Sequence, residues 1–318
     1  MENKSKKCLV TGATGVVGFP LVSELLKQGH QVKVLVRNVV DFFPVEVEQV
    51  IGDLLDENSL QKATQNCDWV FHLAAKLHIN NPTENLANEY REININATRK
   101  LLEFSKNAEK FIFFSTINVY GESVSSKIFD ETDELKPSGL YAESKYAAEK
   151  LVLLQKNGIV LRLAAVYGSR MKGNYLSVLS LIRKGIFVFI GEGENRRTLI
   201  HHQDAARAAV FIAENSKNSS QIYNVSDNKI HTFRDIVENI SKVIGKNPPK
   251  IQIPVSVARF IFRIIDKFSS VSGKKLPINS ELLIKLLEDM AVSSDKLKSL
   301  GFEPEFNLEN GWREVIGK

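Results

Sequence analysis

The feature of this 318-residue sequence that most constrains its fold is a glycine pattern between a short apolar run and an amphipathic helical pattern. Cys8, Leu9 and Val10 form the apolar run, and the glycines then recur at every third position. Glycine permits a tight turn here and lets backbone N–H groups approach a pyrophosphate at the positive N-terminus of the next helix. We interpret this segment as a dinucleotide site rather than a turn that binds nothing. We expect it to bind through Gly12, Thr14, Gly15, Val16, Val17 and Gly18.

The first half of the chain alternates short apolar runs with helical patterns, which is typical of βαβ units. The predicted strands are Lys7–Thr11, Val32–Val36, Val47–Ile51, Trp69–His72, Phe111–Ser115 and Val160–Leu163. The helical patterns between them are Val16–Gln28, Ser59–Thr64, Glu84–Asn107 and Ser138–Lys156. The strands are almost wholly apolar, which suits burial on both faces. The sequence therefore predicts an α/β fold with a doubly wound parallel sheet of Rossmann type.

The rhythm changes after Gly168, where helical patterns are joined by connections rich in Gly, Asn and Pro. These patterns are Tyr175–Lys184, Asp204–Glu214, Phe233–Ile244 and Val255–Phe268. They indicate a smaller, mostly helical C-terminal module laid against the sheet. We expect a nucleotide-binding domain over residues 1–165 and a substrate-binding module over 166–318, with the segment of about 196–227 returning to the core.

Composition and charge narrow the possible partners. The 42 Lys and Arg exceed the 37 Asp and Glu, but no dense basic block appears, which argues against a nucleic-acid partner. No apolar run reaches the ~18 residues of a membrane span. The amphipathic pattern Val255–Phe268 is expected to pack on its own domain, with a membrane surface as the alternative. Cys8 and Cys67 lack metal-ligand spacing, and no signal peptide is visible, so we expect a reduced cytoplasmic protein without a metal.

Candidate catalytic residues lie in the predicted helix Ser138–Lys156 and at the end of the strand before it. Tyr141 and Lys145 are four residues apart, which places them on one helix face. A free phenol has a pKa of about 10, and a nearby lysine cation would lower it toward the range of a useful base. Ser115 and Thr116 follow at the end of that strand. We expect Tyr141 to transfer a proton and Lys145 to tune it.

Several motifs in this order resemble those of the extended short-chain dehydrogenases/reductases, and in particular the nucleotide-sugar epimerases and reductases of the NAD-dependent epimerase/dehydratase family. The motifs are the glycine loop, Thr116 ahead of Val119-Tyr120-Gly121, the Tyr141/Lys145 pair, and Asn94 with Thr98 in a long helix. The resemblance covers nearly the whole chain. It implies that Thr116 is the catalytic hydroxyl that orients the substrate oxygen. It also implies further dinucleotide contacts from Ser115, Tyr141, Lys145, Asp53, Leu54, Leu73, Ala74 and Ala75. It also implies a homodimer formed through the helices Glu84–Asn107 and Ser138–Lys156.

The end of the second strand bears on the choice of cofactor. A carboxylate there selects NAD through the ribose 2′-OH, whereas a cation selects NADP through the 2′-phosphate. Here Arg37 and Asn38 follow Val36, and no acid is present. Arg37 could stack on adenine and pair with a phosphate, so we expect NADP, with NAD as the alternative.

The resemblance also bears on the substrate. Arg197 matches the position where nucleotide-sugar epimerases hold a phosphate, with a pair to a carboxylate as the alternative. Ile117 and Asn118 stand where dehydratases carry acids, which disfavours elimination. Ala165 replaces the asparagine of UDP-galactose 4-epimerases and points toward simple reductases.

Three functions remain open at this point. The first is an NAD(P)-dependent epimerase or reductase of a nucleotide-linked sugar. The second is an NADPH-dependent reductase of a small or hydrophobic carbonyl compound, of the dihydroflavonol or 3β-hydroxysteroid type. The third is a dinucleotide-binding sensor or scaffold without turnover, which the presence of both Tyr141 and Lys145 disfavours.

Overall fold

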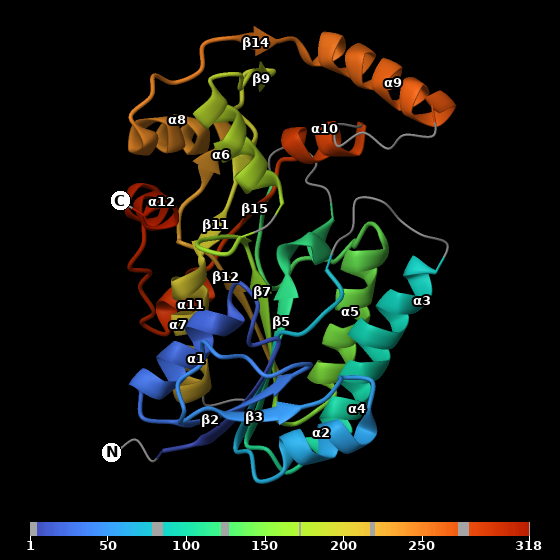
Figure 1. The fold of residues 1–318 in the computed structure, drawn as a ribbon, viewed down its shortest axis with the longest axis vertical. Coiled ribbons are helices and arrows are strands. Elements are labelled where there is room, and N and C mark those ends of the chain that lie inside the picture. Colours follow the sequence, from blue (N-terminus) through green and yellow to red (C-terminus); the bar gives the residue numbers. More distant parts are fainter. Residues whose placement is uncertain are drawn as a thin grey trace.

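The structure is a computed structural model, and it describes residues 5–77, 85–121, 127–171, 173–216, 220–272 and 280–317. Glu84, where one predicted helix begins, lies outside the described residues. Figure 1 shows a sheet flanked by helices, with a second group of helices at one end of the molecule.

The core of the molecule is a parallel sheet of seven strands in the order β12-β7-β5-β4-β1-β2-β3. Its strands in chain order are β1 (Lys7–Thr11), β2 (Gln31–Val36), β3 (Glu48–Ile51), β4 (Trp69–His72), β5 (Lys110–Thr116), β7 (Gly158–Leu163) and β12 (Gln221–Val225). The predicted α/β fold with a doubly wound parallel sheet is confirmed. All six predicted strands are present, and β12 is added at the edge by pairing with β7.

Helices cover both faces of this sheet because successive strand residues point to opposite sides. In β1, Cys8 and Val10 belong to one apolar cluster and Leu9 belongs to another. Helices α1 (Gly18–Lys27) and α7 (His202–Asn215) pack together on the first side. Helices α2 (Glu57–Thr64), α4 (Ala97–Phe104) and α5 (Leu140–Leu153) form the layer on the other side.

The long helix predicted over Glu84–Asn107 is divided in the structure. It consists of α3 (Leu86–Tyr90), a π-helical turn η1 (Arg91–Asn96) and then α4. The wider turn of a π-helix shifts the face that later residues present, and such turns often occur at functional sites.

The second half builds an apolar cluster of its own around Trp312 and Phe189. Besides α7, the helices of this half are α6 (Asn174–Lys184), α8 (Phe233–Ile244), α9 (Val255–Ser272), α10 (Ser280–Leu287), α11 (Asp295–Ser299) and α12 (Leu308–Ile316). The short elements are η2 (Ile117–Tyr120), β6 (Ile128–Phe129), β8 (Ala165–Tyr167), β9 (Phe189–Ile190), β10 (Arg196–Arg197), β11 (Leu199–His201), β13 (His231–Thr232), β14 (Gln252–Ile253) and β15 (Ala291–Val292). The division of the chain near residue 165 remains our proposal.

Two further observations concern the whole of the described chain. None of its helices combines the length and hydropathy needed to cross a membrane. Cys8 and Cys67 are buried and unpaired.

Candidate active site

The glycine loop connects β1 to α1 and lies against the end of β4. Gly12 has a φ of 74°, and a Cβ added to it would stand 2.7 Å from the backbone nitrogen of Ala74. A Cβ on Gly18 would stand 2.2 Å from the Gly12 carbonyl oxygen. The Gly15 N–H donates to that same carbonyl at 3.0 Å, which closes the turn. Only glycine fits these positions without displacing backbone.

The surroundings of this loop fit a dinucleotide. Thr14 and Gly15 are exposed, and the first turn of α1 carries no acidic residue. The partial positive charge of the helix N-terminus therefore remains available to a phosphate. Leu73, Ala74 and Ala75 follow β4 directly and are half-buried, and the backbone of Leu73 and Ala74 lies against Gly12.

A chain of buried hydrogen bonds runs from β1 toward α5. The Thr11 hydroxyl lies 2.8 Å from Nδ1 of His72, whose Nε2 lies 2.9 Å from the Thr98 hydroxyl. Burial and the Lys145 charge lower the pKa of His72 to about 3, so its ring is neutral near pH 7. Thr98 donates its own proton to the Asn94 carbonyl, so it accepts from Nε2–H of His72. Nδ1 is then the acceptor for Thr11.

The same chain continues through the side chain of Asn94, which lies in the π-helical turn. Its Nδ2 donates to the Ser144 hydroxyl at 2.9 Å and to the Lys76 carbonyl at 3.1 Å. Its Oδ1 accepts from the Lys76 backbone N–H at 2.7 Å. Ser144 in turn donates to the Tyr141 carbonyl at 2.8 Å. The turn of α5 that carries Tyr141 is thereby joined to the loop after β4.

Tyr141 and Lys145 both lie on α5, which packs against β5 and η2. Lys145 is buried, and its ammonium lies 4.0 Å from the centre of the Phe113 ring. Burial lowers the pKa of Lys145 to about 7, although Glu149 opposes this shift. Burial and the neighbouring Tyr90 raise the pKa of Tyr141 to about 12. The lowering of the Tyr141 pKa that we expected from Lys145 is therefore not seen here, since burial and Tyr90 both raise that pKa.

The two hydroxyls at the end of β5 differ in their surroundings. Oγ1 of Thr116 is half-buried and accepts from the Asn118 N–H at 3.2 Å. Oγ of Ser115 is fully buried and has no hydrogen-bond partner within the described residues. Strand alternation places Ser115 on the same side of β5 as Phe113, the side on which Lys145 lies. An orphaned hydroxyl at this point has unused capacity to bind a ligand.

An ion pair buried behind α5 was not predicted from the sequence. Arg162 on β7 donates from Nη2 to Glu149 at 2.9 Å and from Nη1 to the Tyr120 hydroxyl at 3.0 Å. The Tyr120 hydroxyl donates onward to Oδ1 of Asn224 at 2.8 Å. This network ties α5 to β7, η2 and β12. A charged residue inside an apolar strand was the one signal available, because a buried charge requires a partner.

The residues expected to bind the adenosine end lie at the carboxyl edge of the sheet. Arg37 follows β2 and is exposed, and the structure brings no carboxylate against it within the described residues. Asp53 follows β3, and its Oδ1 accepts from the Leu55 N–H at 2.9 Å. Leu54 is half-buried against the core. β1, β2 and β3 are adjacent and parallel, so these residues follow neighbouring strand ends.

Arg197, the expected phosphate ligand, is half-buried and already has partners. It donates to Glu288 at 3.1 Å and to the Leu286 carbonyl at 3.4 Å. The neighbouring Arg196 makes the equivalent pair with Asp289 at 2.9 Å. The alternative of pairing with a carboxylate of its own chain is thus what the structure shows.

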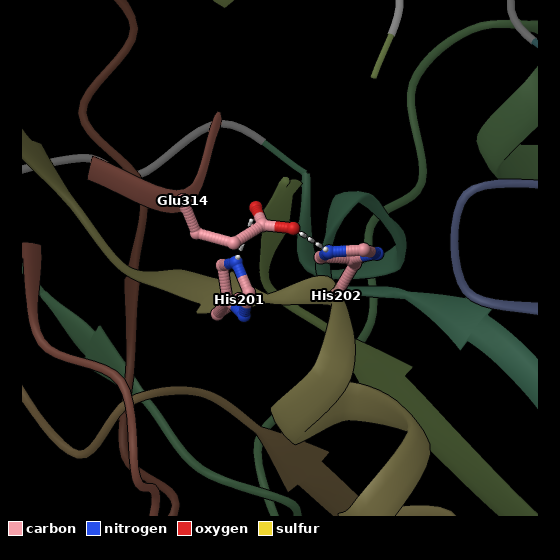
Figure 2. Close-up of side chains that lie close together, drawn as sticks. All are labelled: His201, His202 and Glu314. Carbon is pink, nitrogen blue, oxygen red and sulfur yellow. Dashed lines mark hydrogen bonds and ion pairs between the residues drawn. The ribbon is translucent and has the colours of Figure 1, made fainter. Parts of the chain in front are cut away.

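A second cluster that the sequence did not predict joins the C-terminal helix to the glycine loop. Figure 2 shows the Glu314 carboxylate facing the rings of His201 and His202. The Glu314 carboxylate on α12 lies 3.3 Å from Nε2 of His201 and 3.5 Å from Nε2 of His202. Burial and the neighbouring His202 lower the pKa of His201 to about 4, so its neutral ring can donate Nε2–H to Glu314. Nδ1 of His202 lies 3.2 Å from the Val16 carbonyl, which can only accept. The cluster therefore holds α12 beside the phosphate loop.

The fold and this site define an NAD(P)-dependent enzyme of the extended short-chain dehydrogenase/reductase type. The chain belongs to the NAD dependent epimerase/dehydratase family, whose model matches residues 8–226. The resemblance inferred from the motifs is confirmed.

Individual proteins agree with this assignment. The chain is 29% identical to UDP-glucose 4-epimerase of Vibrio cholerae, over 98% of this chain and 94% of that protein. It is 26% identical to N-acetyl-alpha-D-glucosaminyl-diphospho-ditrans,octacis-undecaprenol 4-epimerase of Escherichia coli, over 95% of this chain and 92% of that protein. The fold matches the crystal structure of UDP-glucuronic acid 4-epimerase from Bacillus cereus in complex with UDP-glucuronic acid and NAD, with a TM-score of 0.77, 23% identity and 98% of both chains covered.

Proposed function

We propose that the chain is an NAD(P)-dependent epimerase or reductase that acts on a nucleotide-linked sugar. The observation that carries this proposal is the buried chain from Thr11 through His72, Thr98 and Asn94 to Ser144. It links the strand of the glycine loop to the helix turn that carries Tyr141. The V. cholerae and B. cereus relatives are named as UDP-sugar epimerases, which supports the same substrate class.

The proposed chemistry assigns one step to each side chain. The nicotinamide, when bound, supplies or accepts a hydride at the reacting carbon. Oγ1 of Thr116 already accepts from the Asn118 N–H, so its own proton can be donated to the substrate oxygen. A Tyr141 pKa of about 12 keeps the phenol protonated near neutral pH, so Tyr141 is prepared to donate a proton to that oxygen during reduction. Lys145 and the Ser115 hydroxyl would hold the cofactor.

We favour NADP over NAD because Arg37 directly follows β2 and no acidic residue stands at the end of this strand. The B. cereus structure names NAD, and NAD remains the alternative for this chain. Arg197 would hold the diphosphate after exchanging its Glu288 partner for phosphate oxygens. A homodimer through the layer of α3, α4 and α5 is also proposed.

A second candidate, reduction of a small or hydrophobic carbonyl compound, is favoured by Ala165. It lies in β8, pairs with Leu199 and offers no polar group to a sugar. An epimerase keeps its dinucleotide through each turnover, whereas a reductase releases it. Dinucleotide retained through gel filtration would favour the epimerase, and its loss would favour a reductase.

One plate of thermal unfolding measurements tests the substrate class. A ligand that binds only the folded chain raises its apparent stability by mass action. NADP and NAD are each paired with UDP-, dTDP- and GDP-sugars. A shift with one dinucleotide and one sugar nucleotide is expected, and no shift with any sugar nucleotide would remove this substrate class. With a substrate in hand, Thr116→Val should impair turnover and Thr116→Ser should not, because only serine keeps the hydroxyl.

A further inference from the structure

Helix α9 lies at the extremity of the C-terminal module, as Figure 1 shows at the top of the view. One side of it packs on its neighbours. Ala258 and Phe262 are buried against Leu283 of α10, together with Ile190 and Ile253. Packing on its own domain, which the sequence predicted, therefore accounts for this side only.

The other side of α9 exposes a continuous apolar stripe. Phe260, Ile264 and Phe268 recur at helical spacing with Val257 and Ile261, which places all of them on one face. Their exposed fractions run from 40% for Ile261 to 66% for Phe260. Single exposed apolar residues are common on soluble proteins, but a contiguous stripe of this kind marks an interaction surface.

A basic stripe runs beside this apolar stripe. Arg259, Arg263 and Lys267 are four residues apart in succession and all are exposed. None of them makes an ion pair with the described residues. The acid of this helix, Asp266, is half-buried and accepts from the Ser280 N–H on the α10 side. The charge that α9 offers to its surroundings is therefore entirely positive.

We propose that α9 lies on the surface of an anionic membrane, with its apolar stripe in the boundary between headgroups and acyl chains. A helix with an apolar face and flanking Lys or Arg is the arrangement that binds such a surface in the plane of the bilayer. At 18 residues, α9 is about 27 Å long, enough to seat all five apolar side chains at once.

Charge decides between the membrane and a second copy of the chain. A symmetric contact between two α9 helices would bring both sets of cations to one interface, with no exposed acid on α9 to neutralise them. Anionic headgroups neutralise them directly and attract basic residues close to the surface. The proposal is independent of the sugar substrate, because it uses no residue of the candidate active site.

Flotation of the full chain with lipid vesicles tests this proposal. Wild type should float with vesicles of phosphatidylglycerol and phosphatidylcholine in equal parts, and much less with phosphatidylcholine alone. The Phe260→Glu/Ile264→Glu variant should not float. The matched control is Val45→Glu/Leu154→Glu, which adds the same charge at exposed apolar positions outside α9 and should float like wild type. Thermal unfolding of all three proteins checks that each is folded.

A second variant isolates the electrostatic part. Arg259→Gln/Arg263→Gln should weaken binding to the anionic vesicles about ten- to thirty-fold, because each cation near such a surface contributes about 1 kcal/mol. Wild type that stays unbound with the anionic vesicles would overturn the proposal. Equal flotation of the two glutamate variants would also overturn it. Sedimentation velocity adds one further contrary outcome, a wild-type dimer that only the α9 glutamate variant dissociates, since a second copy would then cover the stripe.

Discussion

The side-chain amide of Asn94 donates a hydrogen bond from Nδ2 to the Ser144 hydroxyl at 2.9 Å, and this bond joins the π-helical turn η1 to the helix α5. The contact holds the turn of α5 that carries Tyr141 at a fixed distance from the loop after β4, because Asn94 also binds both backbone groups of Lys76. Asn94 lies within the π-helical turn, and such turns often occur at functional sites.

Replacing Asn94 by alanine should destabilise the protein. The Ser144 hydroxyl and the Lys76 backbone groups would lose buried partners, and each unsatisfied group costs about 1–3 kcal/mol. Urea unfolding measures the loss. Asn96→Ala is the control, since Asn96 lies in the same turn but its side chain binds Glu92 and Arg99 at the surface. Equal stabilities for the two variants would show that Asn94 does not carry this junction.

Removing the Tyr141 hydroxyl should stop the chemistry and spare the fold. Tyr141→Phe is expected to lower turnover by about 10²–10⁴-fold while dinucleotide binding is retained. Tyr146→Phe changes the same group on the same helix and should turn over like wild type, because Tyr146 contacts Lys150 outside the site. Steady-state kinetics with an identified substrate makes the comparison. Near-normal turnover in Tyr141→Phe would show that another group transfers the proton to the substrate oxygen.

Stability should depend on pH through Lys145. An unfolded lysine titrates near 10.4, whereas burial lowers the folded pKa of Lys145 to about 7. Between these values the unfolded chain binds the extra proton, so the stability of wild type relative to Lys145→Met should rise as pH increases from about 7 to about 10. Below about pH 7 both states are protonated, and the cost of the buried charge is fully present. Lys150→Met, which removes an exposed lysine of the same helix, should show no such trend.

How much of the fold and the candidate site could be predicted depends on whether the sequence signal is local or involves segments that are distant in the chain. Strands β1 and β4 and helix α8 have the bounds expected from the sequence, because an apolar run or a helical period is local. The π-helical turn was missed because nothing in its composition distinguishes it from a regular helix. The ion pair between Arg162 and Glu149 was missed for another reason. A charge inside the strand Val160–Leu163 signals that a partner exists, but only the packing of α5 on β7 identifies it.

The choice of cofactor should depend on Arg37. If it contacts a 2′-phosphate, Arg37→Ala should weaken NADP about ten- to hundred-fold, the range for a charge-assisted hydrogen bond, and weaken NAD far less, since NAD lacks that phosphate. Lys106→Ala removes an exposed cation elsewhere and should change neither affinity. Calorimetric titration of both dinucleotides gives the constants. Wild type that binds NAD as tightly as NADP would contradict the expected preference.

Arg197 and Arg196 offer a matched pair for the substrate site. Each is half-buried and each pairs with an acid, Glu288 or Asp289, in the segment that follows α10. Arg196 holds Asp289 through two side-chain bonds, so Arg196→Ala should also cost stability. Only Arg197 matches the phosphate position, so Arg197→Ala should raise KM for the sugar nucleotide about ten- to hundred-fold with little change in dinucleotide binding, since a charge-assisted contact is lost. Arg196→Ala should leave KM near the wild-type value.

Steady-state kinetics and thermal unfolding are measured for both variants. A general destabilisation of this segment would lower the unfolding temperature and raise KM in both variants. A KM that rises equally in both variants, or in neither, would remove Arg197 from the diphosphate site.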